Sequence, residues 1–99
     1  MSYSVRIDPY EDGQLVQELL EKDSSGWFLR EYFTSERGRE EFIRFTVQNK
    51  LDELNGRYEL GGWLEDQLEG TDFYSLTDCL DYLEDKFEDA MEFIHANEH

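Results

Sequence analysis

The sequence predicts a small, mostly α-helical domain (α+β at most) with two longer helices, two or three short helices and a short N-terminal strand. Apolar residues repeat at three- and four-residue steps over two long stretches, as in helices that bury one face. Only short stretches alternate as strands do. The gaps between these stretches are short, which is typical of a compact helical fold. Residues 1–99 are expected to form a single acidic domain.

The first expected element is a short strand. Apolar residues occupy every second position from Tyr3 to Ile7, and Pro9 ends the run because proline lacks a backbone N–H for a sheet. The other short alternating run is 57–60 (R-Y-E-L), which makes it the expected partner in a two-stranded ribbon. The sequence leaves open whether the strand pairs within the chain or with another chain.

Two short helices are expected next, at about residues 13–22 and 27–33. Asp12 is a suitable N-cap for the first, because short polar side chains accept hydrogen bonds from free backbone N–H groups at a helix start. The residues between the two helices, 23–26, are a polar break in which Ser25 is a candidate cap.

The first long helix is expected from Glu36 to Leu54. Asn55-Gly56 suits a left-handed C-cap at its end. The same dipeptide is a favoured hairpin turn, but the helical spacing before it favours the cap. The predicted apolar face consists of Ile43, Val47, Leu51 and Leu54, widened by Phe42 and Phe45.

The second long helix is expected from Ser75 to Asn97, after a short helical stretch at 63–68 that Gly70 ends. Ser75 and Asp78 have the spacing of a capping box, in which each side chain binds a backbone N–H of the first turn. The predicted apolar face of this helix consists of Leu76, Cys79, Leu80, Leu83, Phe87, Ala90, Met91 and Ile94.

Six carboxylates fall on the opposite face of this second long helix, and we call them the acidic row: Asp78, Asp81, Asp85, Glu88, Asp89 and Glu92. Lys86 is the only Lys or Arg in the helix. The whole chain has a net charge of −16, and residues 58–99 hold 13 acids and one base. Solvated helix faces usually mix signs, so this one-sided charge indicates more than solubility.

Catalytic and metal-binding patterns are missing from the sequence. The single cysteine, Cys79, lies on an apolar helix face, where a buried and inert thiol is expected. Glu92, His95 and His99 lie near one helix face, but a helix frays at a terminal residue, so a solvated tail without a metal is expected. We therefore predict no catalytic residue, no cofactor, no metal and no enzymatic activity.

The same composition narrows the expected location and partners. No stretch approaches the about 20 apolar residues of a membrane span, and the N-terminus lacks a signal-peptide core, so a cytoplasmic protein is expected, in the host cytoplasm if a phage encodes it. The negative charge disfavours direct binding to nucleic acid or to an anionic membrane. The arginines of 36–50 alternate with acids and are expected to pair with them.

A basic protein surface is thus the expected partner of the acidic row. The row spans about 21 Å of helix, and its neighbouring carboxylates are spaced near the separation of duplex phosphates. The sequence therefore predicts a non-catalytic inhibitor that occupies the groove of a basic nucleic-acid-binding protein. The predicted partner-binding residues are the acidic row together with Tyr82, Glu65, Asp66, Glu69 and Trp63.

Two other interpretations remain open from the sequence. The acidic face can simply be solvated, which is common for acidic helices. Alternatively, the chain is an acidic adaptor or regulatory protein that docks through hydrophobic helix faces. The oligomeric state is not determined by the sequence.

At the level of its class, the chain resembles the small acidic DNA-mimic inhibitors of phages and mobile elements, of which the anti-CRISPR and anti-restriction proteins are the main groups. The resemblance lies in small size, strong negative charge, acidic helical faces and an aromatic-rich core. It implies occlusion of a nucleic-acid-binding groove, for example that of a CRISPR or restriction effector, without catalysis. No family motif is matched, so the resemblance assigns no functional residue.

Overall fold

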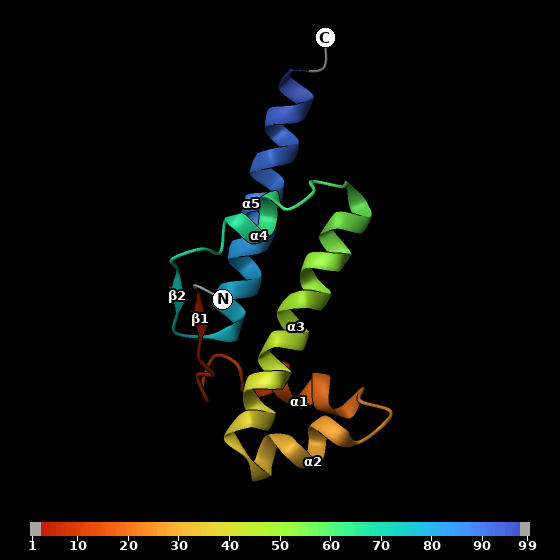
Figure 1. Ribbon diagram of the computed structural model, residues 1–99, viewed down its shortest axis with the longest axis vertical. Helices are drawn as coiled ribbons and strands as arrows, with labels where there is room; N and C mark the ends of the chain where they lie inside the picture. Colours follow the sequence, from red (N-terminus) through yellow and green to blue (C-terminus); the bar gives the residue numbers. More distant parts are fainter. Residues whose placement is uncertain (1–2, 98–99) are drawn as a thin grey trace.

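The computed structural model describes residues 3–97, and within this range the chain forms five helices and a two-stranded parallel sheet (Figure 1). Two helices are long and three are short, which confirms the predicted fold class. The elements are, in order, β1 (Ser4–Val5), α1 (Gly13–Glu21), α2 (Trp27–Thr34), α3 (Glu36–Arg57), α4 (Trp63–Asp66), β2 (Asp72–Phe73) and α5 (Leu76–Ala96).

The two long helices form the frame of the molecule. Figure 1 shows α3 and α5 side by side and rising in the same direction, with α1 and α2 across their lower ends. The sheet lies on the other side of α5 from α3, and α4 contacts α5. Helix α5 continues beyond the end of α3, and the molecule is correspondingly elongated, with dimensions of 53 × 28 × 23 Å.

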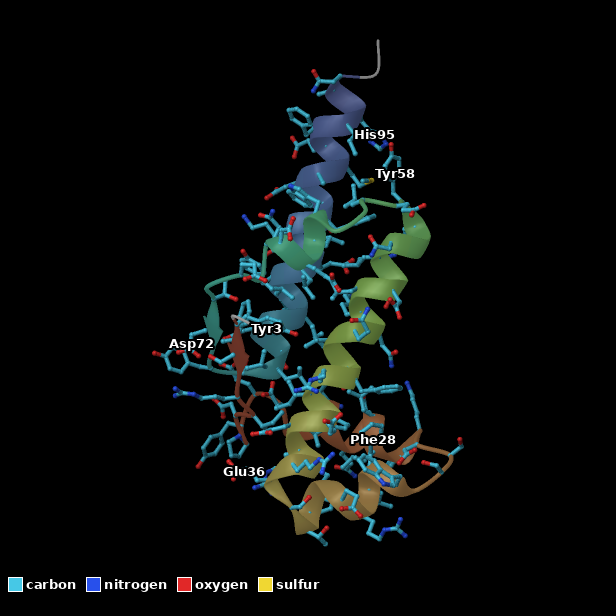
Figure 2. All side chains as sticks on the ribbon, in the orientation of Figure 1. Tyr3, Phe28, Glu36, Tyr58, Asp72 and His95 are labelled. Atoms are coloured by element: carbon cyan, nitrogen blue, oxygen red, sulfur yellow. The ribbon has the colours of Figure 1, made fainter. Side chains whose placement is uncertain are left out.

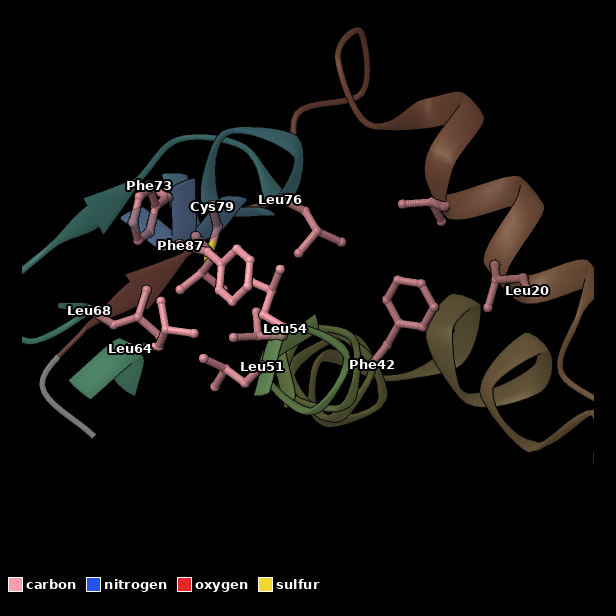
Figure 3. Close-up of a cluster of buried hydrophobic side chains, with 13 residues drawn as sticks. Leu20, Phe42, Leu51, Leu54, Leu64, Leu68, Phe73, Leu76, Cys79 and Phe87 are labelled. Atoms are coloured by element: carbon pink, nitrogen blue, oxygen red, sulfur yellow. The ribbon is translucent and has the colours of Figure 1, made fainter. Parts of the chain in front are cut away.

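The hydrophobic core lies between α3 and α5 and extends under α1 and α4 (Figure 3). The apolar steps predicted for the two long helices are mostly buried there, although Phe45 is 52% exposed because it lies at the outer edge of the α3 face. The buried core side chains are Val16, Leu20, Phe42, Val47, Leu51, Leu54, Leu64, Leu68, Phe73, Leu76, Cys79, Leu83 and Phe87.

The expected strand partner was wrong. Strand β1 pairs within the chain, in parallel with Asp72–Phe73 rather than with 57–60. The Ser4 N–H donates to the Thr71 carbonyl at 3.1 Å, and the Arg6 N–H donates to the Phe73 carbonyl at 3.0 Å. Residues 57–60 are not free to pair because α3 runs to Arg57 and its C-cap, Tyr58, still donates to the Leu54 carbonyl.

The predicted left-handed cap at Asn55-Gly56 was also wrong, because α3 continues through both residues to Arg57. Gly56 does not have a positive φ. The Arg57 side chain donates to Glu53 at 2.6 Å and to Glu84 of α5 at 2.9 Å. The contact with Glu53 lies within α3 and the contact with Glu84 is tertiary, and both favour a helical conformation of the extra turn.

Helix α5 begins at two caps, one of which comes from a distant part of the chain. The Ser75 hydroxyl accepts from the Asp78 N–H at 3.0 Å, as the capping-box spacing predicted. The Asp12 carboxylate accepts from the backbone N–H groups of Leu76 at 2.7 Å and Thr77 at 2.8 Å. Asp12 also precedes α1, but its side chain makes no capping hydrogen bond to that helix, contrary to the sequence prediction.

The described part of the chain contains no helix that is both long enough and apolar enough to cross a lipid bilayer. Helix α5 has 21 residues, but its acidic row makes one of its faces strongly polar.

Candidate functional site: the acidic row of helix α5

The acidic row lies on the solvent side of α5. All six of its carboxylates are exposed, and the helix places them opposite the buried residues Leu76, Leu83 and Phe87. At 100° per residue the six lie within an arc of about 100°. The row is thus an ordered, outward-facing line of negative charge on a rigid helix.

The acid that turns inward on α5 is Glu84, which does not belong to the row. Its carboxylate contacts the Lys50 ammonium at 2.8 Å and the Arg57 guanidinium at 2.9 Å, both on α3. Hydrogen bonds from Lys50 and then from Arg57 lower the pKa of Glu84 below its ordinary value, against the smaller opposing effect of burial. Glu84 therefore joins the two long helices, while the row remains outside this network.

Positive charge is sparse around the row. The ion pairs within residues 3–97 include none of the six carboxylates of the row. Lys86, the only Lys or Arg of α5, lies with its ammonium 5.4 Å from the centre of the Tyr82 ring. The expected pairing of the arginines of 36–50 with the acids between them is met by Arg44, which contacts Glu41 at 3.4 Å. Arg37 and Arg39 form none of the ion pairs within residues 3–97, and Lys50 pairs with Glu84 of α5 instead.

Helix α4 brings a second group of acids beside the row. Glu65, Asp66 and Glu69, in α4 and the turn after it, are all exposed. The Tyr82 hydroxyl donates to the Gln67 carbonyl at 2.7 Å, which ties α4 to α5 at the border of the row. These acids were predicted as a possible extension of the row, and the fold places them on the element that packs next to it.

The two aromatic residues of the predicted site differ in their availability. Tyr82 is half-buried, with its ring packed edge-to-face on Phe73 at 5.2 Å and its hydroxyl bound to Gln67. Trp63, the first residue of α4, is 39% exposed. Tyr82 therefore supports the fold of the site, whereas Trp63 presents part of its ring to solvent.

The single cysteine, Cys79, is free and buried. Burial raises the pKa of the Cys79 thiol to about 12, so the thiol stays protonated at neutral pH. Residues 3–97 contain no cluster of three or more potential metal ligands. Glu92 and His95 are exposed on α5, and His99 lies outside the described residues.

Comparison of the chain with protein-family models, with curated proteins and with solved structures gave no match. Function is therefore inferred from the charge and geometry of the chain itself. Sequence reasoning identified the row but missed the roles of Asp12 and Glu84 in orienting α5, because both roles depend on partners more than 25 residues away.

Proposed function

We propose that this protein is a non-catalytic inhibitor that binds a basic nucleic-acid-binding protein through the acidic row, in place of a nucleic-acid phosphate backbone. The observation that carries the proposal is that six carboxylates are exposed in line on one helix, outside the ion pairs of the fold. A partner with Lys and Arg side chains in a groove would meet these charges as it meets phosphates.

The spacing of the row supports this form of recognition. Asp78, Asp85 and Glu92 follow one another at seven-residue steps, about 10 Å apart, and the other three acids lie between them. Two N-terminal caps and the Glu84 contacts to α3 hold the part of α5 that carries Asp78, Asp81 and Asp85, so these charges are arranged before binding. Preorganised charges lose less entropy on association than mobile ones.

Rigid negative charge also has a kinetic consequence. Electrostatic steering accelerates encounter between oppositely charged proteins, and the acceleration falls as salt screens the charges. The proposed complex should therefore form rapidly at low salt and weaken strongly as the salt concentration rises.

The test reverses the charge at Asp81, Asp85, Glu88 and Glu92 together by substitution with Lys. The assay measures displacement of a fluorescent DNA duplex from purified basic DNA-binding proteins, including a CRISPR effector and a restriction enzyme. The wild-type chain is expected to displace DNA from at least one of them, and the variant is expected to lose this effect. Circular dichroism checks that the variant keeps its helices.

A matched control separates the row from net charge. Substitution of Glu18, Glu21, Glu40 and Asp52 by Lys changes the net charge by the same amount, and all four are exposed on α1 and α3. The control should displace DNA nearly as well as the wild type. Equal displacement of DNA by the row variant and by the wild type would refute a role for this face. A further comparison uses lysozyme, a basic protein without a nucleic-acid groove. If the wild-type chain binds lysozyme as tightly as it binds the DNA-binding proteins, the row acts only by general charge attraction.

A second candidate function is an acidic adaptor that docks through hydrophobic helix faces. The observation in its favour is the exposure of large apolar side chains on two helices, including Leu29 and Phe33 of α2 and Phe93 of α5. Salt separates the two functions, because hydrophobic docking survives at high salt whereas binding through the row does not.

A further inference from the structure

The last part of α5 has no helical neighbour in the fold. Helix α3 ends at Arg57. The Arg57 guanidinium contacts Glu84 at 2.9 Å and lies 5.8 Å from the centre of the Phe87 ring, so α3 ends beside residues 84–87 of α5. Figure 1 shows α5 continuing for several further turns beyond this point. His95, labelled in Figure 2, lies on this projecting end.

The apolar pattern of α5 does not stop where α3 stops. Six apolar residues follow one another at alternating steps of four and three, which is the heptad spacing of helices that pack against other helices: Leu76, Leu80, Leu83, Phe87, Ala90 and Ile94. The first four are buried or packed against the core. Ala90 and Ile94 continue the same repeat beyond the end of α3.

Other apolar side chains widen the face on this projecting end. Met91 is half-buried, and Phe93 is 70% exposed. Carboxylates border the face on both sides, since Glu88 precedes Met91 by three residues and Asp89 precedes Phe93 by four. The surface is therefore an apolar strip with a negative rim.

We infer that residues 90–96 of α5 are a docking surface for an amphipathic helix of a partner protein, with an apolar face and Lys or Arg beside it. The occupant is expected to be a helix because of the heptad spacing. A helix could pack on residues 90–96 in the way that α3 packs on the earlier part of the same apolar face. The negative rim selects a basic helix. A second copy of this chain would instead bring its own carboxylates against the rim.

The inference goes beyond the proposed function, because its occupant packs on the apolar strip, and it shares with the acidic row only Glu88 and Asp89, which border that strip. It names one docking face and the chemistry of its occupant, and it holds whether or not the row imitates phosphates.

The probe is a synthetic amphipathic peptide of about three heptads, with Leu at the core positions and Lys at the others. Its comparison is a peptide of the same composition in scrambled order, which has the same charge but no apolar face. Fluorescence anisotropy of each labelled peptide is measured against the full chain in about 0.5 M salt, where exposed charges are largely screened. The amphipathic peptide is expected to bind at least about tenfold more tightly than the scrambled one.

The double variant Phe93→Ser/Ile94→Ser is expected to weaken binding of the amphipathic peptide at least about tenfold, because apolar anchors dominate such interfaces. The matched control is Leu29→Ser/Phe33→Ser on α2, where the two side chains are 50% and 68% exposed. This control should leave the affinity unchanged. Circular dichroism verifies that both variants keep their helices.

Three results would overturn the inference: equal affinity for the two peptides, an unchanged affinity of the α5 variant, or the same loss in the α2 control. Light scattering that reveals a dimer dependent on Phe93 and Ile94 would also overturn it, since the occupant would then be a second copy. At about 0.5 M salt the row variant, which replaces only Glu88 of the rim, should still bind the amphipathic peptide more tightly than the scrambled one, and this result separates the inference from the proposed function.

Discussion

Asp12 illustrates how a single side chain can organise a distant element. It has no exposed surface, and its carboxylate accepts hydrogen bonds from Asp8 in its own loop and from Leu76 and Thr77 at the start of α5. Burial opposes ionisation of Asp12, but hydrogen bonds from Thr77, Asp8 and Leu76 together lower its pKa below the ordinary value. The charge also lies at the positive end of the α5 dipole, where an anion is stabilised.

Substitution of Asp12 by Asn should reduce the free energy of unfolding by about 1–3 kcal/mol at pH 7, because a charged hydrogen-bond acceptor is lost from a buried site. The pKa of Asp12 is lowered by folding, so its contribution is present above the unfolded pKa of about 3.9 and is lost as the pH falls through the folded value. Urea unfolding at pH 7 and at pH 3 measures both effects.

The control for this prediction is Glu11→Gln, because Glu11 is adjacent and exposed. It should change the stability little at either pH. If Asp12→Asn is as stable as the wild type at pH 7, the carboxylate does not serve as the cap described above.

Gly38 allows a close contact between α2 and α3. A Cβ at this position would collide with the backbone carbonyl of Glu31, and Gly38 itself is buried in the first turn of α3. Gly38→Ala should therefore destabilise the protein by about 1–3 kcal/mol, since the neighbouring atom belongs to the backbone and yields with difficulty. Thermal or urea unfolding provides the measurement.

Gly56→Ala is the matched control, because Gly56 is in the same helix with no atom near its added Cβ and no positive φ. It should stabilise the protein by up to about 1 kcal/mol, as alanine is the better helix former. Similar effects of the two substitutions would contradict the proposed contact at Gly38.

At the scale of elements, the faces of α5 have different surroundings and make different contacts. Its apolar face packs on α3, Glu84 forms ion pairs with α3 beside that face, and the acidic row faces solvent. The projecting end beyond Phe87 carries the apolar strip, which has no helical neighbour in the fold. Helical geometry permits this separation because residues three and four apart share a face.

Glu84→Gln should lower the stability by about 1 kcal/mol or less, because partly exposed ion pairs contribute little after screening. Folding lowers the pKa of Glu84, so ionised Glu84 stabilises the folded protein. This contribution to the free energy of unfolding is present above the unfolded pKa of about 4.3 and disappears as the pH falls through the folded value. Chemical denaturation between pH 7 and pH 3 measures this difference. Asp85→Asn, in the exposed row, should cost no stability, and an equal loss in both variants would argue against the network.

At the scale of the whole molecule, the dominant physical feature is a net charge of −16 on 99 residues. Such a charge destabilises the compact state through self-repulsion. Ion pairs with bases of α3 offset the repulsion at Glu84, whereas the row lies outside these pairs. The molecule thus retains an unfavourable concentration of charge on one exposed face.

Raising the salt concentration from low values to about 0.5 M should increase the melting temperature by about 4 °C or more, because screening relieves repulsion over the whole surface. Differential scanning calorimetry measures the shift. The row variant, in which four acids become Lys, should respond less to salt than the wild type. A melting temperature that falls with salt would show that the ion pairs outweigh the repulsion.

The helical architecture follows from local patterns in the chain. The predicted limits of α5, from the Ser75 cap to Asn97, agree with the structure because the capping box and the apolar period are properties of neighbouring residues. The starts of α1, α2 and α3 also agree with the prediction, although Asp12 does not cap α1. Outward exposure of the acidic row is a consequence of helical periodicity once the opposite face is buried.

The sequence by itself therefore determined the helices, their buried faces and the position of the acidic row. Only the tertiary structure decided that β1 pairs with Asp72–Phe73, that α3 continues through Gly56, and that Asp12 caps α5 rather than α1. The physical reason is the range of the interactions: helical periodicity and capping act over three or four residues, whereas these three outcomes depend on backbone groups and side chains that only the folded chain brings together.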